Sequence, residues 1–521
     1  CSREAGDTQT VSCTGSGVVD ECGECGGSGP DQHFTCSGFK PETKDALQEA
    51  VDMWVSSPES TEAAYGHISD WDVSLITDMS NLFLNKSTFN DDIGSWDVSN
   101  VTSMYRMLYN AQEFNQDLNF WDVSSVTNMS GMFYSENFNG NISNWDVSSV
   151  TDMSSMFVYA TNFNGDLSSW DVSSVTIMQG MFRGTSYSGD LSSWDVSSVT
   201  EMHNMFGWFN GTVDISSWDV SSVTNMHRMF CQGSFNGDIS GWTTSSLTNT
   251  SEMFSGNTGF NGDINGWDVS NVTTMINMFL GATSFNQDLN SWDVSNGPDM
   301  YNLFSGASSF NGDVSDWDVS NVSSFGSMFQ YTSFNGDLSN WDVSNATHFN
   351  SMFTSTPFNG DISGWDVSSA TSIHTMFSGA TSFNQDVSGW DVSNVGYIGD
   401  MFSGATSFNQ DLSSWDVSNV IHMNNVFHNT IALSDANRCL INSTWSSNNL
   451  WPYDWSENEG CDGVCFSGLV VDDCDVCGGE NADMDCAGVC GGSLALDDCG
   501  VCDGDNSTCT DCLGVVNGSA F

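Results

Sequence analysis

Basic residues are scarce in this chain of 521 residues, which has 8 Lys and Arg against 66 Asp and Glu and a formal net charge of −58. Such an acidic chain repels phosphate backbones and anionic lipid head groups, so binding to nucleic acid or to a membrane surface is disfavoured. Long apolar runs are also missing. No stretch approaches about 18 apolar residues, so we expect neither a membrane-spanning helix nor membrane insertion. The first residue is Cys1 and no signal peptide follows it, which indicates a mature or a truncated chain.

Large apolar residues are plentiful, and they recur at a fixed period. The chain has 34 Phe, 24 Met and 20 Trp, enough to supply a buried stripe despite the acid excess. One unit repeats, approximately Phe-Asn-Gly-Asp-Leu-Ser-Ser-Trp-Asp-Val-Ser-Ser-Val-Thr-x-Met-x-x-Met-Phe, and a period of this size is typical of a solenoid. Its fifteen tryptophans follow one another at 24 or 25 residues: Trp71, Trp96, Trp121, Trp145, Trp170, Trp194, Trp218, Trp242, Trp267, Trp292, Trp317, Trp341, Trp365, Trp390 and Trp415.

Within each coil, the apolar residues at fixed phase are predicted to face inward. Phe-Asn-x-Asp-Leu is compatible with a short strand, and Trp-Asp-Val with a second extended piece after a bend at the two Ser. Val-Thr-x-Met-x-x-Met-Phe has helical spacing and predicts a short helical or 3₁₀ turn. We expect the Asn of Phe-Asn to form a ladder from coil to coil, and the Asp after Trp to cap the turn that follows.

The repeats divide the chain into five segments. Residues 67–430 are predicted to form the solenoid. Residues 39–66 should contain a helix capped by a Thr, and residues 431–458 a short helix capped by a Ser. Each helix would cover one end of the coils, because an open end exposes apolar surface and unpaired backbone groups. Residues 1–38 and 459–521 are rich in Gly and Cys and are predicted to be small modules held by disulfides.

Seventeen cysteines, clustered mainly at the two ends, indicate an oxidising compartment. Zinc binding by the Cys-x2-Cys pairs is the alternative to disulfides, but twelve Asn-x-Ser/Thr sequons favour a secreted chain and therefore disulfides. Cys231 lies alone inside a coil and is predicted to be a free, buried thiol. The disulfide candidates are Cys1, Cys13, Cys22, Cys25, Cys36, Cys439, Cys461, Cys465, Cys474, Cys477, Cys486, Cys490, Cys499, Cys502, Cys509 and Cys512.

The number of disulfide candidates is odd at both ends, five before the repeats and eleven after them. A rod keeps its ends apart, so we hypothesise that subunits join head to tail through a disulfide between neighbouring chains. Truncation of the chain at Cys1 is the alternative explanation.

The twelve sequons predict N-linked glycans on a secreted or cell-surface protein. Four of them lie four residues after a Trp and would decorate one edge of the rod. The predicted acceptors are Asn85, Asn100, Asn128, Asn141, Asn210, Asn249, Asn271, Asn321, Asn345, Asn442, Asn506 and Asn517.

No catalytic or metal site is predicted. His203 and His227 share a phase on adjacent coils, but no carboxylate or Cys converges there, so we interpret them as solvent-facing turn residues. Paired Asp residues recur along the whole rod, whereas a catalytic pair should be unique, and we expect no enzyme. Cofactors are expected to be absent, except that calcium is left open at paired carboxylates without EF-hand spacing: Asp472, Asp473, Asp497 and Asp498.

Aromatic residues occur in the loop after Met-Phe in several coils. Exposed aromatics along one line suggest a contact strip for protein or sugar, and ordinary loop variation is the alternative. The residues are Tyr109, Tyr134, Tyr159, Trp208 and Tyr331.

The repeat resembles BspA-type leucine-rich repeat surface proteins, in the class with a Trp-Asp-Val-Ser…Val-Thr-x-Met-x-x-Met-Phe unit of 25 to 26 residues. The stretch that begins at Tyr65, Tyr-Gly-His-Ile-Ser-Asp-Trp, looks like the first repeat of that family. Trp451-Pro-Tyr-Asp-Trp and the Asp-Asp-Cys-Gly-Val-Cys modules look like regions that follow such repeats in secreted proteins. The resemblance covers residues 41–512, implies a right-handed, leucine-rich-repeat-like solenoid outside the cell, and supplies no catalytic residues.

The sequence therefore leads to two hypotheses about function. The first is a secreted, glycosylated structural protein that forms or decorates an extracellular filament, surface appendage or coat by head-to-tail assembly. The second is a cell-surface adhesion or carbohydrate-binding protein that acts as a rigid monomeric spacer. A polysaccharide hydrolase or lyase is a third possibility, but the chain lacks the unique polar cluster that such an enzyme needs.

Overall fold

The structure is a computed structural model, and its described part is the continuous range 38–458 together with shorter pieces on either side. These pieces are residues 34–35, 464–467, 469–472, 477, 484–485, 487, 489–490, 492–496 and 502–503. Most of the predicted modules 1–38 and 459–521 lies outside the described residues. The same is true of several predicted site residues: Cys1, Cys13, Cys22, Cys25, Cys36, Cys461, Cys474, Cys486, Cys499, Cys509, Cys512, Asn506, Asn517, Asp473, Asp497 and Asp498.

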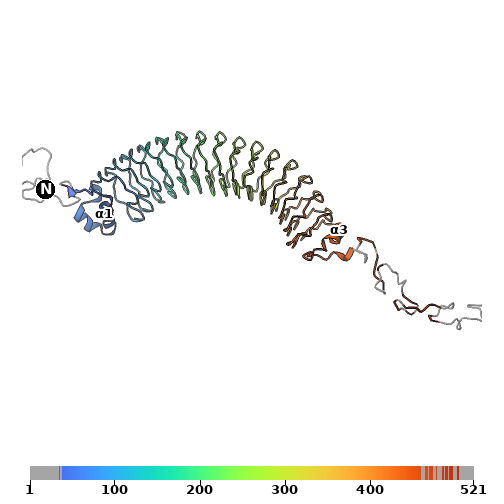
Figure 1. Cartoon of the computed structure of the whole chain (residues 1–521). Helices are drawn as coiled ribbons and strands as arrows, with labels where there is room; N and C mark the ends of the chain where they lie inside the picture. The colour runs from blue at the N-terminus through green and yellow to red at the C-terminus, as the bar shows by residue number, and fades with distance from the viewer. Residues whose placement is uncertain are drawn as a thin grey trace, which may run out of the picture.

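The repeats form a curved stack of coils, one coil for each period of the sequence (Figure 1). Neighbouring coils are joined by parallel bridges of a single residue pair, such as Asp78 with Ser103 and Ser103 with Asn128. No strand runs through residues 67–430, so the short strands expected in Phe-Asn-x-Asp-Leu and Trp-Asp-Val are absent from the coils. The right-handed, leucine-rich-repeat-like class stays a prediction.

The prediction of a helical or 3₁₀ turn in the Met-x-x-Met-Phe segment is wrong. The N–H of Met79 donates to the Ser103 carbonyl of the next coil at 2.9 Å, and the N–H of Asn81 donates to that of Tyr105 at 2.8 Å. Between them, the N–H of Leu82 closes a turn on the Met79 carbonyl within its own coil. Asn81 has a φ of 63°, which no right-handed helix contains. The segment is therefore a series of tight turns whose alternate amides bond to the next coil.

The interior of the stack is a column of aromatic rings. The residues expected to face inward are buried, and successive tryptophans lie parallel, with centroids 6.3 Å apart and an interplanar angle of 2° between Trp121 and Trp145. Each indole N–H also has a partner in the preceding coil. Trp121 Nε1, for example, donates to the Ile93 carbonyl at 3.0 Å. This bond satisfies the buried indole N–H, whereas the hydroxyl of Tyr187, in the same column of rings, is buried without a partner.

Polar ladders bind the outside of the coils. The Asn139 N–H donates to Asn115 Oδ1 of the preceding coil at 2.7 Å, and Asn164 repeats the contact with Asn139. The carboxylate of Asp97 accepts from the N–H and the hydroxyl of Ser99, at 3.1 and 2.6 Å, which closes the turn after Trp. Side-chain acceptors therefore satisfy backbone donors that short coils cannot pair among themselves.

Helices cover the N-terminal end of the stack. Helix α1 (Lys44–Ser56) begins at Thr43, whose side chain accepts from the Ala46 N–H, and it buries Leu47, Ala50, Val51 and Trp54. Helix α2 (Pro58–Tyr65) and the 3₁₀ turn η1 (Ile68–Asp70) lead into the first coil. The sequence reading did not find α2, because it buries only Thr61 and has no apolar stripe. Strands β1 (Phe34–Thr35) and β2 (Gly38–Phe39) pair antiparallel before α1.

Helix α3 (Asp435–Trp445) covers the last coil and begins at Ser434, whose hydroxyl accepts from the Asn437 N–H. Its Trp445 stacks on Trp415 with centroids 6.0 Å apart, so the helix extends the tryptophan column by one step. The 3₁₀ turn η2 (Ser456–Asn458) follows, and a disulfide joins Cys439 of α3 to Cys465. Both ends of the stack are thus closed (Figure 1).

Three antiparallel bridges recur in the C-terminal region, and each ends at a cysteine. They pair Val471 with Cys477, Met484 with Cys490 and Leu496 with Cys502. All three of these cysteines are in disulfides. Among the described residues, no helix is long and apolar enough to cross a membrane.

Candidate functional site

The outward positions after Met-Phe bear different side chains from coil to coil. The first position holds Tyr109, Tyr134 and Arg183 in their respective coils, and the second holds Tyr159 and Trp208. Tyr159 and Trp208 have φ values of 55° and 54°, in the left-handed region. Bulky residues are uncommon there and cost stability, so their presence indicates a role other than folding.

These side chains touch in an unbroken line across adjacent coils. The rings of Tyr109 and Tyr134 stack with centroids 4.4 Å apart, and Tyr134 meets Tyr159 edge-on at 5.5 Å. The guanidinium of Arg183 lies over the rings of Tyr159, at 5.5 Å, and Trp208, at 4.7 Å. Four coil steps of about 4.8 Å each give this line a length of roughly 19 Å.

A second arginine lies at the other end of the line. The guanidinium carbon of Arg106 is 5.0 Å from the centroid of the Tyr105 ring and 5.2 Å from that of Tyr109. Such contacts orient the planar group against the rings and leave its edge N–H groups to donate hydrogen bonds. The two guanidinium groups therefore bracket the three tyrosines.

The line borders a groove of about 620 Å³, which we call the aromatic groove. Its lining includes Tyr105, Arg106, Tyr109, Tyr134, Tyr159 and Arg183, together with Ser, Gln and Gly groups from the turns between them. A pocket with aromatic walls and a few placed polar groups is typical of a ligand site.

The Tyr134 hydroxyl and the Arg183 guanidinium belong to residues that line the aromatic groove. Burial, followed by the neighbouring Tyr109 and Tyr159, raises the pKa of the Tyr134 hydroxyl above its usual value, so this group stays protonated at neutral pH. The Nε of Arg183 is buried without a hydrogen-bond partner. A buried donor that has no acceptor costs free energy, so the placement of Arg183 over the two rings is held at a cost.

The aromatic groove unites three of the five aromatic residues predicted from the sequence. Tyr109, Tyr134 and Tyr159 line it, and Trp208 meets it through Arg183. Tyr331 lies in a coil far along the stack and is 56% exposed. The sequence reading missed Arg106 and Arg183. The scarcity of basic residues was the available signal, because any cation in these repeats is exceptional.

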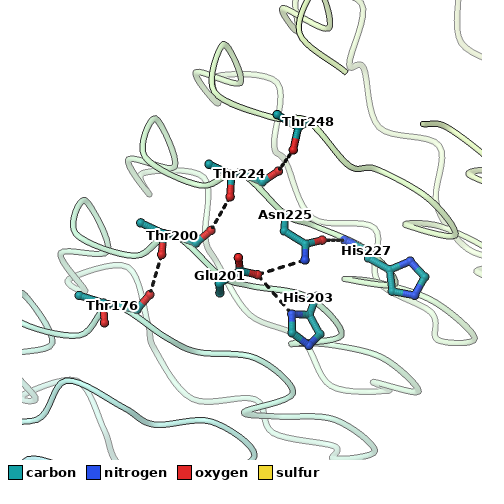
Figure 2. A network of polar contacts seen from close by, with 8 residues as sticks. All are labelled: Thr176, Thr200, Glu201, His203, Thr224, Asn225, His227 and Thr248. Carbon is teal, nitrogen blue, oxygen red and sulfur yellow. Dashed lines mark hydrogen bonds and ion pairs between the residues drawn. The ribbon is translucent and has the colours of Figure 1, made fainter. Parts of the chain in front are cut away.

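The two histidines on adjacent coils have different partners. Glu201 Oε2 is 3.4 Å from His203 Nδ1 and accepts from Asn225 Nδ2 at 3.1 Å (Figure 2). The Nδ1 of His227 instead meets the Ser251 carbonyl, and burial lowers the pKa of this imidazole. One carboxylate does reach His203, contrary to the sequence interpretation. In the described part of the chain, no group of three or more potential metal ligands occurs.

A ladder of threonines runs beside these histidines and holds the coils in register. The hydroxyl of each Thr donates to the carbonyl of the equivalent Thr one coil earlier, from Thr248 back to Thr176 (Figure 2). The histidines and Glu201 thus lie beside a ladder of hydrogen bonds that joins neighbouring coils. Elsewhere, the thiol of Cys231 is free and buried, and burial raises its pKa to about 11.

Four of the sequons share one contact in the structure, and a fifth is buried. The side-chain amide of Asn100 donates to the Ser74 carbonyl at 2.9 Å, and Asn271, Asn321 and Asn345 make the same bond one coil back. Asn442 is 5% exposed, and its Oδ1 accepts from Trp451 Nε1, so a glycan has no room there. Asn442 is therefore corrected from a predicted acceptor to a packing residue of α3.

Five consecutive stretches of the chain match the family described as "Mycoplasma protein of unknown function, DUF285". The matches are residues 52–137, 134–212, 208–300, 267–357 and 332–439, and together they span 52–439, about three quarters of the chain. The chain belongs to the DUF285 family. No curated protein and no solved structure matches it.

The DUF285 matches agree with the resemblance to BspA-type repeat proteins, and they indicate a surface repeat protein. They end before the C-terminal cysteine-rich region and begin after the N-terminal one. The aromatic groove lies wholly inside the DUF285 repeats, between residues 105 and 183.

Proposed function

We propose that this DUF285 protein is a cell-surface adhesion protein that binds carbohydrate in the aromatic groove and holds it on a rigid, curved stack of coils. One observation carries the proposal: on five consecutive coils, aromatic rings and guanidinium groups at the outward positions touch one another in a continuous line. Aromatic faces pack against the apolar faces of sugar rings, while the donors and acceptors between them meet hydroxyl groups.

The proportions of the groove also favour a sugar chain. The line crosses several coils, so a polymer running along the stack contacts one ring after another. Secretion, glycosylation and the absence of enzymatic activity stay predictions, and each is compatible with an adhesion protein.

Head-to-tail filament assembly takes second place. The covered ends of the coil stack disfavour assembly by continuation of the coils, and a disulfide between chains would have to form in the cysteine-rich regions outside the stack. Helix α1 buries Trp54 against the first coils, and α3 places Trp445 on the last tryptophan of the column. A neighbouring chain could not continue the coils without displacing these helices. Electron microscopy separates the two ideas, since adhesion predicts separate curved rods and assembly predicts filaments.

Glycan-array binding by the full chain tests the proposal. We expect the wild type to bind a set of glycans, and Tyr109→Ala with Tyr134→Ala to weaken that binding about tenfold, because each lost ring contact is worth ~0.5–1.5 kcal/mol. The matched control is Tyr301→Ala with Tyr331→Ala, which removes two exposed rings elsewhere on the stack. Failure of the wild type to bind any glycan, or equal losses in both double variants, contradicts the proposal.

A further inference from the structure

Cations in this protein almost always pair with a carboxylate. Among the described residues, Lys40, Lys44, Lys86, Arg228 and Arg438 each lie within 3.5 Å of an Asp or Glu oxygen. With 66 acidic residues in the chain, this pairing is the expected result.

Arg106 and Arg183 are the two exceptions among the cations that the structure describes. Neither makes an ion pair, and their contacts are the aromatic rings of the groove. In a chain of net charge −58, these two arginines lie three coils apart, line the same groove and have no carboxylate partner.

The charge balance of the groove is the reverse of that of the chain. Its lining contains two guanidinium groups and one carboxylate, Asp152. That carboxylate already accepts hydrogen bonds from the N–H and the hydroxyl of Ser154. The groove thus has a net positive charge, with an unpartnered guanidinium N–H at Arg183 Nε.

We propose that the ligand of the aromatic groove is an anionic polysaccharide, whose sulfate or carboxylate groups bind Arg106 and Arg183 while its sugar rings pack on the tyrosines between them. The inference rests on the proposed carbohydrate-binding function and adds the charge of the ligand. Guanidinium groups bind such oxyanions with two parallel N–H donors, and the stacking on Tyr and Trp fixes their planes in advance.

The acidity of the rest of the chain does not prevent this binding. At physiological ionic strength, charges more than about 8 Å apart across solvent are largely screened, so the two arginines dominate the field inside the groove. The surrounding carboxylates instead restrict the ligand to a place where its anions meet cations.

The test uses the full chain and three immobilised probes: dextran, dextran sulfate and carboxymethyl dextran. We expect at least about tenfold tighter binding to one or both anionic polymers than to dextran, since hydrogen bonds between charged groups are the stronger class. Arg106→Gln with Arg183→Gln should abolish this preference. The control Arg228→Gln, which breaks the pair with Glu252, should leave it unchanged.

The outcomes distinguish the two proposals. Equal binding to all three polymers overturns the anionic ligand and leaves carbohydrate binding standing. Binding to none of them, together with an empty glycan array, overturns both. A preference that survives in the double variant also overturns the role of the arginines.

A salt titration of the wild type keeps the inference testable if the double variant does not fold. Raising NaCl from about 0.05 M to about 0.5 M should weaken binding to the anionic polymer several-fold and leave dextran binding nearly constant. A binding constant for the anionic polymer that does not change with salt contradicts the inference.

Discussion

The coils of the aromatic groove and the coils of the later half of the stack have the same interior and different surfaces. At the end of the groove region, Trp170 and Trp194 stack at 6.4 Å with an interplanar angle of 1°. In the later region, Trp292 and Trp317 stack at 6.2 Å with an angle of 1°. The buried residues of a coil are therefore set by stacking on the next coil, wherever the coil lies.

The second outward position shows the difference most clearly. It requires a positive φ in both regions. Several later coils meet this requirement with Gly281, Gly306 and Gly404, at 68° to 73°, whereas Tyr331 lies there alone at 59°. The groove coils place Tyr159 and Trp208 there, which is the more costly choice. The comparison teaches that stacking fixes the interior of each coil, whereas the outward positions vary, and that the groove residues differ from Tyr331 by touching their neighbours in one line.

The largest effect is expected from the shared interior. Trp194→Ala and Trp317→Ala should each lower the free energy of unfolding by about 3–5 kcal/mol, because each leaves a cavity in the ring column. Both also orphan a carbonyl that the indole N–H reaches, on Leu167 and Leu289 respectively. Chemical denaturation followed by circular dichroism measures the loss.

Trp208→Ala is the control for these two substitutions. Its indole is 38% exposed, so unfolding should shift by no more than about 0.5 kcal/mol. The losses in unfolding free energy of Trp194→Ala and Trp317→Ala should be similar. If they differ from each other by as much as either differs from the loss of Trp208→Ala, the two regions do not share one interior.

The backbone requirement at the second outward position should have the next largest effect. Gly404→Ala should destabilise the protein by about 1 kcal/mol, because Ala at a φ of 73° is strained although the site has space for a Cβ. Gly389→Ala is the matched control. It has open space and no positive φ, so it should be neutral or slightly stabilising. The melting temperatures of the two variants are compared by thermal unfolding. Equal shifts in melting temperature would show that a positive φ has no cost at this position, for Tyr159 as for Ala.

The turn caps should respond to acid in the same way in both regions. Hydrogen bonds from the hydroxyl and the N–H of a Ser lower the pKa of Asp146 and Asp219 in the first half, and of Asp342 in the second. Since the folded pKa is depressed, this stabilisation is complete above the unfolded value of about 3.9 and is lost as pH falls through the folded pKa.

We therefore expect the melting temperature to hold or rise from pH 7 to about pH 4, as repulsion among the acids decreases, and to fall below that. Asp219→Asn and Asp342→Asn should each flatten the acid limb slightly and equally. A melting temperature that rises continuously to pH 2 would show that the caps contribute nothing.

The smallest effect concerns the edge amides. Asn345 belongs to a sequon and Asn394 does not, yet both donate to the carbonyl one coil back, at 2.8 Å. Substitution of either by Ala should cost the same, about 0.5–1.5 kcal/mol, as expected for one hydrogen bond. Mass spectrometry of native protein should find Asn442 unmodified. A glycan on Asn442 would mean that α3 does not pack as described.

Much of the coil could be predicted from the sequence, because the tryptophan period states which residues are equivalent and must stack. The turn segment could not. Met at i, i+3 and Phe at i+4 fit a helical turn as well as they fit a run of tight turns. The local signal for a positive φ was a Gly or Asn immediately before the second Met of Met-x-x-Met-Phe, as at Gly131, Gly180 and Asn204.

The groove was half predictable for a similar reason. Exposed tyrosines in a variable loop stand out in the sequence of a repeat protein, whereas Arg106 and Arg183 gain meaning only once their lack of a carboxylate partner is known. That property depends on packing between coils, and no spacing within one repeat reports it.

The disulfide between Cys439 and Cys465 decides how the molecule bears tension. A pull applied beyond Cys465 passes through the sulfur bridge to the middle of α3, and the 25 residues between the two cysteines do not bear the load. The load then enters the stack through the helix whose Trp445 terminates the ring column. In a surface protein anchored by its C-terminal region, a force that reaches Cys465 would thus be transmitted directly to the helix that closes the coil stack.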